Sequence, residues 1–329
     1  MSFTNSQWGY KRETTWATSI ITANADVAYK LGLMVGDQIH PTPVTSLQYN
    51  PPAHNTAEAP SAEKKDMVVT GKYNFIAQNG VFLEWILGKS STPAPAGGIY
   101  THTITTPADG SLLPSFTTHL KMDGSATAWN LQTVGVKASS VKLLTDANEF
   151  PSLLATVEVV GKKTDTSAVT LDVAPALPAT ATTTAYVFNK LSREFDSAAI
   201  SGLISVELDI IAGTTPVFDS TYDGATYDGN WAEQLTEAPK RLYRLKMSVV
   251  LEDDTFWTEM IAMGNTKNLV FKWVKSTDDY IQITCTDVHF LAHPVITRSG
   301  SKTIAELSCE IISLSVEVKY KLVGGFYGE

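Results

Sequence analysis

The chain has 329 residues, of which 43% are hydrophobic and 18% charged, and its formal net charge is −9. A negative chain lacks the basic face with which a conventional nucleic-acid binder neutralises phosphates. The length predicts about two domains, and a charged fraction below the ~25% of ordinary soluble domains indicates surface buried against other chains.

The sequence predicts a protein that is made and folded in a cytoplasm. The start of the chain has no apolar central run of a signal peptide, and no stretch approaches the ~20 apolar residues of a membrane span. Cys285 and Cys309 both lie in expected strands. Their number and setting favour buried free thiols over a disulfide framework.

The first quarter of the chain contains an expected strand and an expected helix. Five prolines between positions 41 and 60 predict a long irregular loop. Residues 67–75 are then expected to form a strand. Residues 81–87 predict a short helix that is apolar on nearly every face, so it is expected to be buried.

The run from 115 to 161 occurs twice in similar form. It begins SFTTHLKMDG, continues as a long extended run, and ends in the Leu- and Val-rich SLLATVEVVG. At a shift of 154 positions Phe116 corresponds to Val270 and Leu153 to Leu307. We interpret this as an internal duplication.

The internal similarity extends to the strand and helix that precede this run. Residues 71–88 correspond to 245–264, where a counterpart helix is expected at 255–263. The duplication predicts one unit at 1–163 and a second at 191–329. A Thr-, Ala- and Pro-rich linker at 164–190 is expected to join them. Residues 212–240 predict a second long loop.

Hydrophobic alternation predicts antiparallel strands, and it slips in three places. Residues 203–211 alternate cleanly, as in a half-buried strand. The pattern shifts by one residue near 131–134, 285–288 and 311–314. Such a slip requires a bulge or a bend. Strands of this kind can leave one sheet and enter another, as in orthogonally packed sheets.

Catalytic motifs are not recognised in the sequence. It contains no glycine-rich phosphate loop, nucleophile elbow or paired-cysteine metal site. His289 and His293 flank an expected bend without clustered ligands, which disfavours a metal site. Carboxylates at Asp219, Asp223 and Asp228 could hold Ca²⁺, but their spacing fits no helix-loop-helix calcium loop, so a turn-rich contact loop is favoured.

Five carboxylates stand on polar faces of expected strands: Glu158, Glu207, Asp209, Glu306 and Glu310. They form either an ordinary solvated face or a shared acidic surface inside a closed ring of copies. The residues alone leave both interpretations open.

The chain resembles the tail tube proteins of long-tailed, non-contractile phages and related viruses, and the resemblance lies in the order of several segments along the chain. The matching segments are GYKRETTWAT at 9–18, the unit at 71–88, LPSFTTHLKMDG at 113–124, TVGVKASSVKLL at 133–144 and LLATVEVVGKK at 153–163. The resemblance covers most of 1–163 and, through the duplication, 200–320. It implies a mainly β fold of two tandem tail-tube-like β-sandwich or barrel modules, each with a short flanking α-helix and long loops.

The resemblance also implies a structural role without catalysis, cofactor or metal. Family members with one module form rings of six, so two modules imply a homotrimeric ring, with a homohexamer as the alternative. Stacked rings would conduct viral DNA without binding it. The further implied partners are the tape-measure protein in the lumen and the tail terminator and distal tail proteins. The expected location is the virion tail, after assembly in the host cytoplasm.

Within that hypothesis, the five carboxylates line the lumen and the loops 37–66 and 212–240 touch the next ring. The expected ring contacts are Tyr49, Asp223, Tyr227 and Trp231. The alternative from another class is a pair of β-sandwich carbohydrate-binding or adhesin modules, with Tyr222, Tyr227 and Trp231 as a sugar platform. Another virion role, as capsid or tail terminator protein, and an enzyme are less favoured alternatives.

Overall fold

The fold is given by a computed structural model of the 329-residue chain. The structure describes residues 7–19, 21, 42–49, 62–77, 80–88, 96–106, 112–123, 128–166, 185–188, 191–195, 198–218, 231–232, 234–238, 240–251, 267–291 and 295–321. The counterpart helix expected at 255–263 lies outside the described residues.

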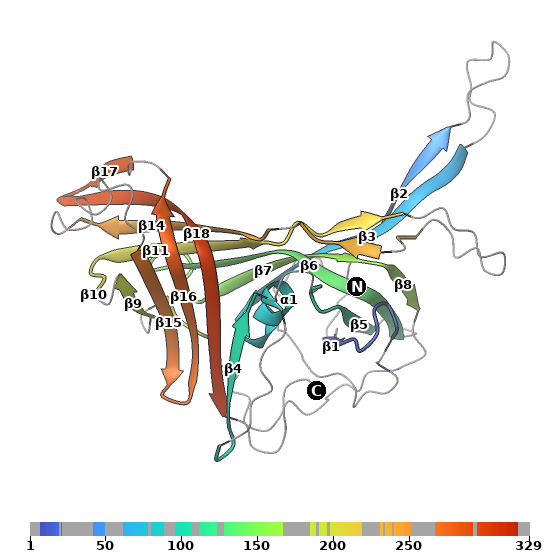
Figure 1. The fold of residues 1–329 in the computed structure, drawn as a ribbon, viewed down its shortest axis with the longest axis horizontal. Coiled ribbons are helices and arrows are strands. Elements are labelled where there is room, and N and C mark those ends of the chain that lie inside the picture. Colours follow the sequence, from blue (N-terminus) through green and yellow to red (C-terminus); the bar gives the residue numbers. More distant parts are fainter. Residues whose placement is uncertain are drawn as a thin grey trace, which may run out of the picture.

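The described residues form mostly β-strands (Figure 1). In the first half the strands are β1 (Gln7–Arg12), β2 (Thr42–Tyr49), β3 (Ala62–Ile76), β4 (Ile99–Thr105), β5 (Phe116–Asp123), β6 (Ala128–Asp146), β7 (Leu154–Gly161) and β8 (Lys163–Thr166). In the second half they are β9 (Leu191–Phe195), β10 (Ala198–Ala199), β11 (Leu203–Ile211), β12 (Thr215–Val217), β13 (Gln234–Thr236), β14 (Leu242–Val250), β15 (Lys267–Ser276), β16 (Asp279–Phe290), β17 (Val295–Ser299) and β18 (Lys302–Lys321). A 3-10 turn, η2 (Val81–Leu83), leads into the helix α1 (Glu84–Leu87).

A long antiparallel sheet crosses the whole molecule, in the strand order β18–β14–β11–β6–β7–β3–β2. We call it the spanning sheet; it runs along the top of Figure 1. Strands of both halves of the chain contribute to it, and β11 of the second half pairs directly with β6 of the first. The expected mainly β fold is therefore confirmed.

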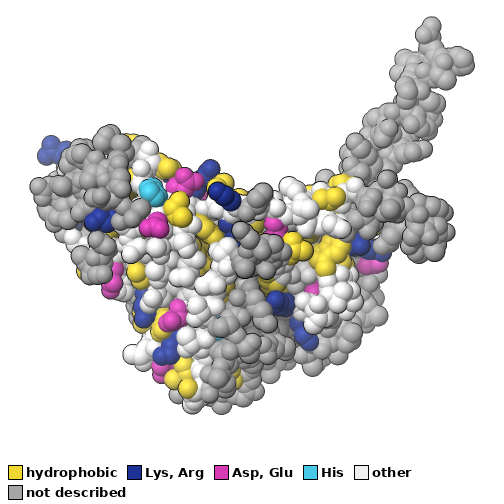
Figure 2. All heavy atoms as spheres, viewed as in Figure 1, with side chains coloured by type: hydrophobic (Ala, Val, Ile, Leu, Met, Phe, Trp, Pro, Cys, Tyr) yellow, Lys and Arg dark blue, Asp and Glu magenta, His cyan; other side chains and the backbone are white. Residues whose placement is uncertain are grey.

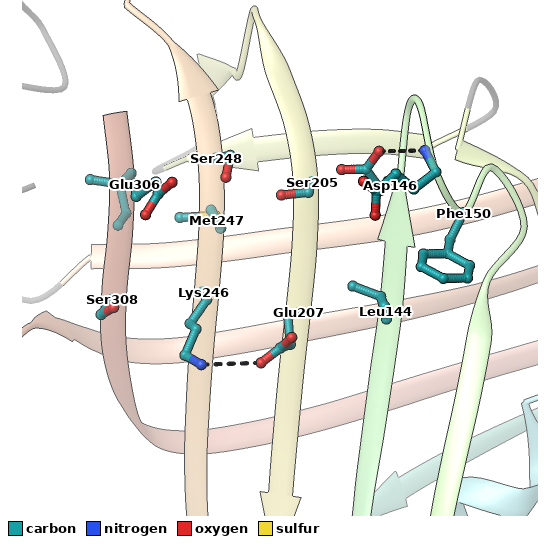
Figure 3. Close-up of a pocket in the computed structure, with 12 residues that line it drawn as sticks. Leu144, Asp146, Phe150, Ser205, Glu207, Lys246, Met247, Ser248, Glu306 and Ser308 are labelled. Carbon is teal, nitrogen blue, oxygen red and sulfur yellow. Dashed lines mark hydrogen bonds and ion pairs between the residues drawn. The ribbon is translucent and has the colours of Figure 1, made fainter. Parts of the chain in front are cut away.

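Two strands leave the spanning sheet midway. From residue 137 onward β6 pairs with β7, whereas its first part pairs with β5 and β8. Similarly, β18 pairs first with β14 and later with β4, while β16 pairs with its second part. Other strands form a second layer, which crosses behind the spanning sheet (Figure 3). Both strands therefore change partners midway, at the places where the hydrophobic pattern slips.

Each slip in the hydrophobic pattern has a local cause. The β5–β6 register shifts next to Gly135, whose φ is 68°. The β15–β16 register shifts beside Asp287, whose φ is 55°. In β18 the buried positions change phase between Ile311 and Leu314, where the strand passes from β14 to β4. The first two slips are β-bulges, and the third is a bend.

A buried carboxylate holds the bulge in β6. Glu13, which follows β1, accepts hydrogen bonds from the backbone N–H of Gly135 (2.8 Å) and the hydroxyl of Thr117 (2.9 Å) through Oε1. Its Oε2 accepts from the Ser115 hydroxyl (2.6 Å) and the Ala17 backbone N–H (2.8 Å). The charge is therefore fully hydrogen-bonded, as burial requires.

The short helix fills the space beneath the spanning sheet, as Figure 1 shows. Every α1 residue is buried, which confirms the expected apolar helix. Trp85 packs edge-on against Tyr10, with ring centroids 4.6 Å apart, and stacks on Phe116 at 4.7 Å. Each such buried aromatic stabilises the fold by about 1.5–3 kcal/mol. The helix thus ties β1, β5 and the spanning sheet into one core.

Two predicted loops contain strands. Residues 42–49 of the proline-rich run form β2, which pairs with β3 and makes that prediction wrong there. Proline is tolerated because β2 is the end strand of the sheet, where one edge requires no N–H donor. Within 212–240, β12 and β13 form a second short hairpin.

The pairing pattern of the first half recurs in the second. The order β1–β5–β6–β7–β3 in the first half matches β9–β15–β16–β18–β14 in the second, with every neighbour antiparallel. The pattern agrees with a duplicated unit. The division into modules at 1–163 and 191–329, joined by a linker at 164–190, stays a prediction.

A buried ion-pair network joins the two halves. Lys137 Nζ of β6 lies 3.0 Å from Oε1 of Glu237, and these side chains are 4% and 9% exposed. The same oxygen accepts the backbone N–H of Leu113 at 2.7 Å. Arg241 approaches the other oxygen at 3.5 Å and donates to the carbonyl of Ile86. The second half is thereby fixed to β6, to the segment before β5 and to α1.

Candidate functional site

One face of the spanning sheet is polar and continuous across both halves of the chain. Alternate residues of β7, β6, β11, β14 and β18 are buried in the core, and those between them lie on the opposite face. We call this opposite side the polar face. All five predicted carboxylates lie on it: Glu158, Glu207, Asp209, Glu306 and Glu310.

Strand register places acidic and basic residues opposite one another on this face. The strongest example is a row that crosses six strands: Asn74, Thr156, Lys142, Asp209, Arg244 and Glu310. We call it the charged row. Opposite charges at directly facing positions of a sheet stabilise the pairing. The row therefore strengthens the sheet across the boundary between the two halves.

The central carboxylates are held by two lysines. Lys142 Nζ lies 3.1 Å from Oε1 of Glu207 and 3.7 Å from Oδ1 of Asp209. Lys246 Nζ lies 3.3 Å from the same Glu207 oxygen, the contact drawn in Figure 3. Such partly exposed pairs contribute about 0.2–1 kcal/mol each. Their larger effect is on the charge that the face presents.

The proton affinities of this group follow from these contacts. Burial acts to lower the pKa of Lys142, but Glu207 and Asp209 outweigh it and raise that pKa. Burial acts to raise the pKa of Glu207, but hydrogen bonds and charge from Lys142 and Lys246 lower it. Burial raises the pKa of Asp209, although Lys142 opposes the change. Glu207 and Lys142 thus hold opposite charges at neutral pH.

The ends of the face are also mixed in character. At one end Glu158 stands opposite Lys72 and accepts a hydrogen bond from Ser140 Oγ at 2.9 Å. At the other, Glu306 lines a shallow depression together with Asp146 and Ser308 (Figure 3). Figure 2 shows acidic and basic side chains next to one another along the upper margin of the molecule.

The basic residues of this face were not predicted from the sequence. Four residues share it with the five carboxylates: Lys72, Lys142, Arg244 and Lys246. They occupy the same period-2 positions as the acids, so counting every charge on each expected strand would have found them. The described part of the face therefore carries acidic residues, Asp146 among them, beside basic ones, and the lumen-lining role of the five carboxylates stays a prediction.

The other predicted contact residues are mostly not placed. Asp219, Tyr222, Asp223, Tyr227 and Asp228 lie outside the described residues, as does His293. Tyr49 belongs to β2, which is described by its backbone. Trp231 is half-buried and forms an isolated bridge with Met67 of β3. Their role in ring contacts stays a prediction.

Within the described ranges, no group of three or more metal-ligating side chains comes together. His289 is exposed and stands opposite Glu310. The described residues contain no helix long and apolar enough to cross a membrane. Cys285 and Cys309 are buried and free, which confirms the expected thiols. Burial raises the pKa of both, to about 12 for Cys309, so neither is a ready nucleophile.

Comparison with known proteins gives one family match. The model of a family described as phage tail tube protein matches residues 4–318, which is nearly the whole chain. A search of curated proteins finds no match.

Proposed function

Because the chain belongs to the phage tail tube protein family, we propose that its copies assemble into stacked rings whose channel is lined by the polar face. The family makes the protein a structural component of the virion tail. The observation that carries the proposal is the continuity of the polar face over strands from both halves. A sheet that is apolar on one side and polar on the other suits the wall of a water-filled channel.

We infer a homotrimer with pseudo-sixfold symmetry. The matching orders β1–β5–β6–β7–β3 and β9–β15–β16–β18–β14 support two like modules per chain. Three such chains supply the six modules that six single-module subunits supply in simpler rings. The spanning sheet already joins the two modules through β6 and β11, so the same type of contact can be repeated between chains. A homohexamer is the alternative.

The lining would let DNA pass without holding it. Two lysines of the polar face are engaged by carboxylates, Lys142 by Glu207 and Asp209 and Lys246 by Glu207, so they are less available to phosphates. The remaining acidic excess repels phosphates. With Lys142 and Lys246 engaged in this way, the release of counterions that drives DNA binding is weakened. In this proposal the lining binds DNA weakly because its basic side chains are paired with carboxylates, and not only because of its negative charge.

The remaining parts of the proposal follow from this role. The channel holds the tape-measure protein before ejection, and the tail terminator and distal tail proteins close the two ends of the tube. Assembly takes place in the host cytoplasm, and the tail is of the non-contractile type. The segments 37–66 and 212–240, with Tyr49, Asp223, Tyr227 and Trp231, contact the next ring.

Labelling of a single introduced cysteine tests the position of the polar face. Ser308 is exposed on this face, and the native thiols of Cys285 and Cys309 are buried. In assembled tubes of Ser308→Cys, N-ethylmaleimide should react, whereas a maleimide on a 5-kDa-class polyethylene glycol should not. Both reagents should label the unassembled protein. Equal labelling of tubes by the large reagent would place the face outside and refute the proposal.

A further inference from the structure

The depression on the polar face collects carboxylates that have no cation beside them. It lies near the strand ends, where β6 connects to β7, and it encloses about 270 Å³ (Figure 3). Its charged lining residues are Asp146, Glu149, Glu207, Lys246 and Glu306. Lys246 is engaged by Glu207 at 3.3 Å. No ion pair between described residues reaches the other three carboxylates, so the depression carries uncompensated negative charge. We call it the acidic depression.

The floor of the acidic depression contains a row of short side chains. Ser205 of β11 lies opposite Asp146 of β6 and opposite Ser248 of β14. Ser248 lies in turn opposite Glu306 of β18. Figure 3 shows the two serines between the two carboxylates. Because adjacent strands lie roughly 4.8 Å apart, the row is a trough with a carboxylate at each end, about 14 Å from the other.

One wall of the depression adds apolar surface. Phe150 is 40% exposed in the connection between β6 and β7, and Figure 3 places its ring next to Asp146 and Leu144. Asp146 holds this connection by accepting the backbone N–H groups of Asn148 (2.6 Å) and Glu149 (2.9 Å). A guanidinium group stacks on aromatic rings and pairs with carboxylates through a planar fork. The wall therefore favours arginine over lysine as the bound cation.

We propose that the acidic depression binds arginine side chains of a cationic polypeptide held in the channel. This rests on the proposed position of the polar face. The enclosed volume lies below the about 300–1,000 Å³ of small-molecule pockets, so it suits one or two side chains. DNA is a poor occupant because the carboxylates repel phosphates. The charge that keeps DNA from adhering would thus retain the polypeptide that occupies the channel before DNA.

The distance between the two ends of the trough sets the spacing of the cations. A separation of about 14 Å corresponds to about four residues of an extended chain or about nine residues of an α-helix. Two arginines at either spacing can reach Asp146 and Glu306 at the same time. Binding at two linked points is tighter than binding at one.

Fluorescence anisotropy of a dye-labelled peptide, measured with the unassembled protein, tests the acidic depression. The peptide carries two arginines four positions apart, and matched peptides carry lysines or glutamines there. Glu149→Gln/Glu306→Gln should weaken binding of the arginine peptide roughly fivefold or more at low salt, because both side chains are exposed and two ion pairs are lost. The lysine peptide should bind more weakly than the arginine peptide.

The matched control removes the same charge from places outside the depression. Glu158→Gln/Asp165→Asn alters one carboxylate on the polar face and one on β8, neither of which lines the depression. It should change binding of the arginine peptide less than about twofold, because exposed charges more than a Debye length away are screened. Circular dichroism confirms that both double variants are folded.

The outcomes separate this proposal from the proposed function. Equal losses of binding in the two double variants, or equal binding of the glutamine peptide, would overturn the acidic depression as the site. Displacement of the peptide by millimolar Mg²⁺ at constant ionic strength would make it a metal-ion site and overturn the polypeptide as its occupant. Specific binding together with labelling of Ser308→Cys tubes by the large maleimide would instead refute the channel lining and leave the depression as an arginine site.

Discussion

Replacement of Glu237 by Gln should destabilise the protein far more than its single charge suggests. The side chain is 9% exposed and receives Lys137 Nζ at 3.0 Å and the Leu113 N–H at 2.7 Å on one oxygen. Glutamine keeps the shape and one acceptor, but it leaves the ammonium group of Lys137 buried without a counter-charge. Breaking a buried pair on one side costs about 3–5 kcal/mol. Because one acceptor remains, we expect about 3 kcal/mol.

The assay is urea unfolding followed by circular dichroism, with the free energy of unfolding taken from midpoint and slope. The double variant Lys137→Met/Glu237→Gln removes the unpaired ammonium group of Lys137, the shorter of the two contacts of Glu237, and should recover a large part of the loss. Lys142→Met is the surface comparison, since that side chain is 43% exposed and its ion pairs lie on the polar face. It should cost less than about 1 kcal/mol.

A loss of stability in Glu237→Gln no larger than that in Lys142→Met would refute the buried ion pair as its cause. A double variant less stable than Glu237→Gln alone would do the same, because the loss could not then be attributed to an uncompensated lysine.

Three further changes test the bulge and the buried titratable groups. Gly135→Ala should lower the free energy of unfolding by about 3 kcal/mol, because φ is 68° and an added Cβ would lie 3.0 Å from the Cβ of Lys162. Gly97→Ala is the control: its φ is 63° but the space around it is open, so it should cost about 1 kcal/mol. Equal losses of stability in thermal unfolding would contradict the crowding at Gly135. Burial raises the pKa of Glu84 to about 7, so its stabilising effect is present below pH 4.5 and lost as the pH rises through 7. Relative to wild type, Glu84→Gln should therefore gain about 3 kcal/mol of stability between pH 4.5 and 7.5, and a constant difference would refute this. Burial lowers the pKa of His102 to about 4, so its contribution to stability is present above pH 6.5 and lost as the pH falls through 4. His102→Gln should remove this loss of stability in acid. The same fall in stability below pH 6.5 in the variant and the wild type would contradict the prediction.

The sequence predicts the strands and their irregularities well, because hydrophobic alternation records burial directly. The slip at 285–288 marks the bulge at Asp287, and the slip at 311–314 marks the bend of β18. The apolar helix at 81–87 is equally legible. In each case the signal is local, since neighbouring side chains must alternate between core and solvent.

The contacts that could not be predicted from the sequence depend on the register between strands that are distant along the chain. The pairing of Lys142 with Asp209 requires β6 and β11 to be neighbours, which no local pattern records. The buried contact of Glu237 with Lys137 likewise spans a hundred positions. β2 was missed for a different reason: the prolines of 41–60 are characteristic of a loop, but the single proline inside the strand, Pro43, is compatible with a strand at the end of a sheet.

Electron cryomicroscopy of tubes grown from the purified protein tests the central claim most directly. We expect three chains in each ring, with the spanning sheets joined around a channel and Lys142, Glu207 and Asp209 facing its interior. Rings of six chains would contradict the trimer. A map in which the polar face lies on the outer wall would contradict the channel lining itself.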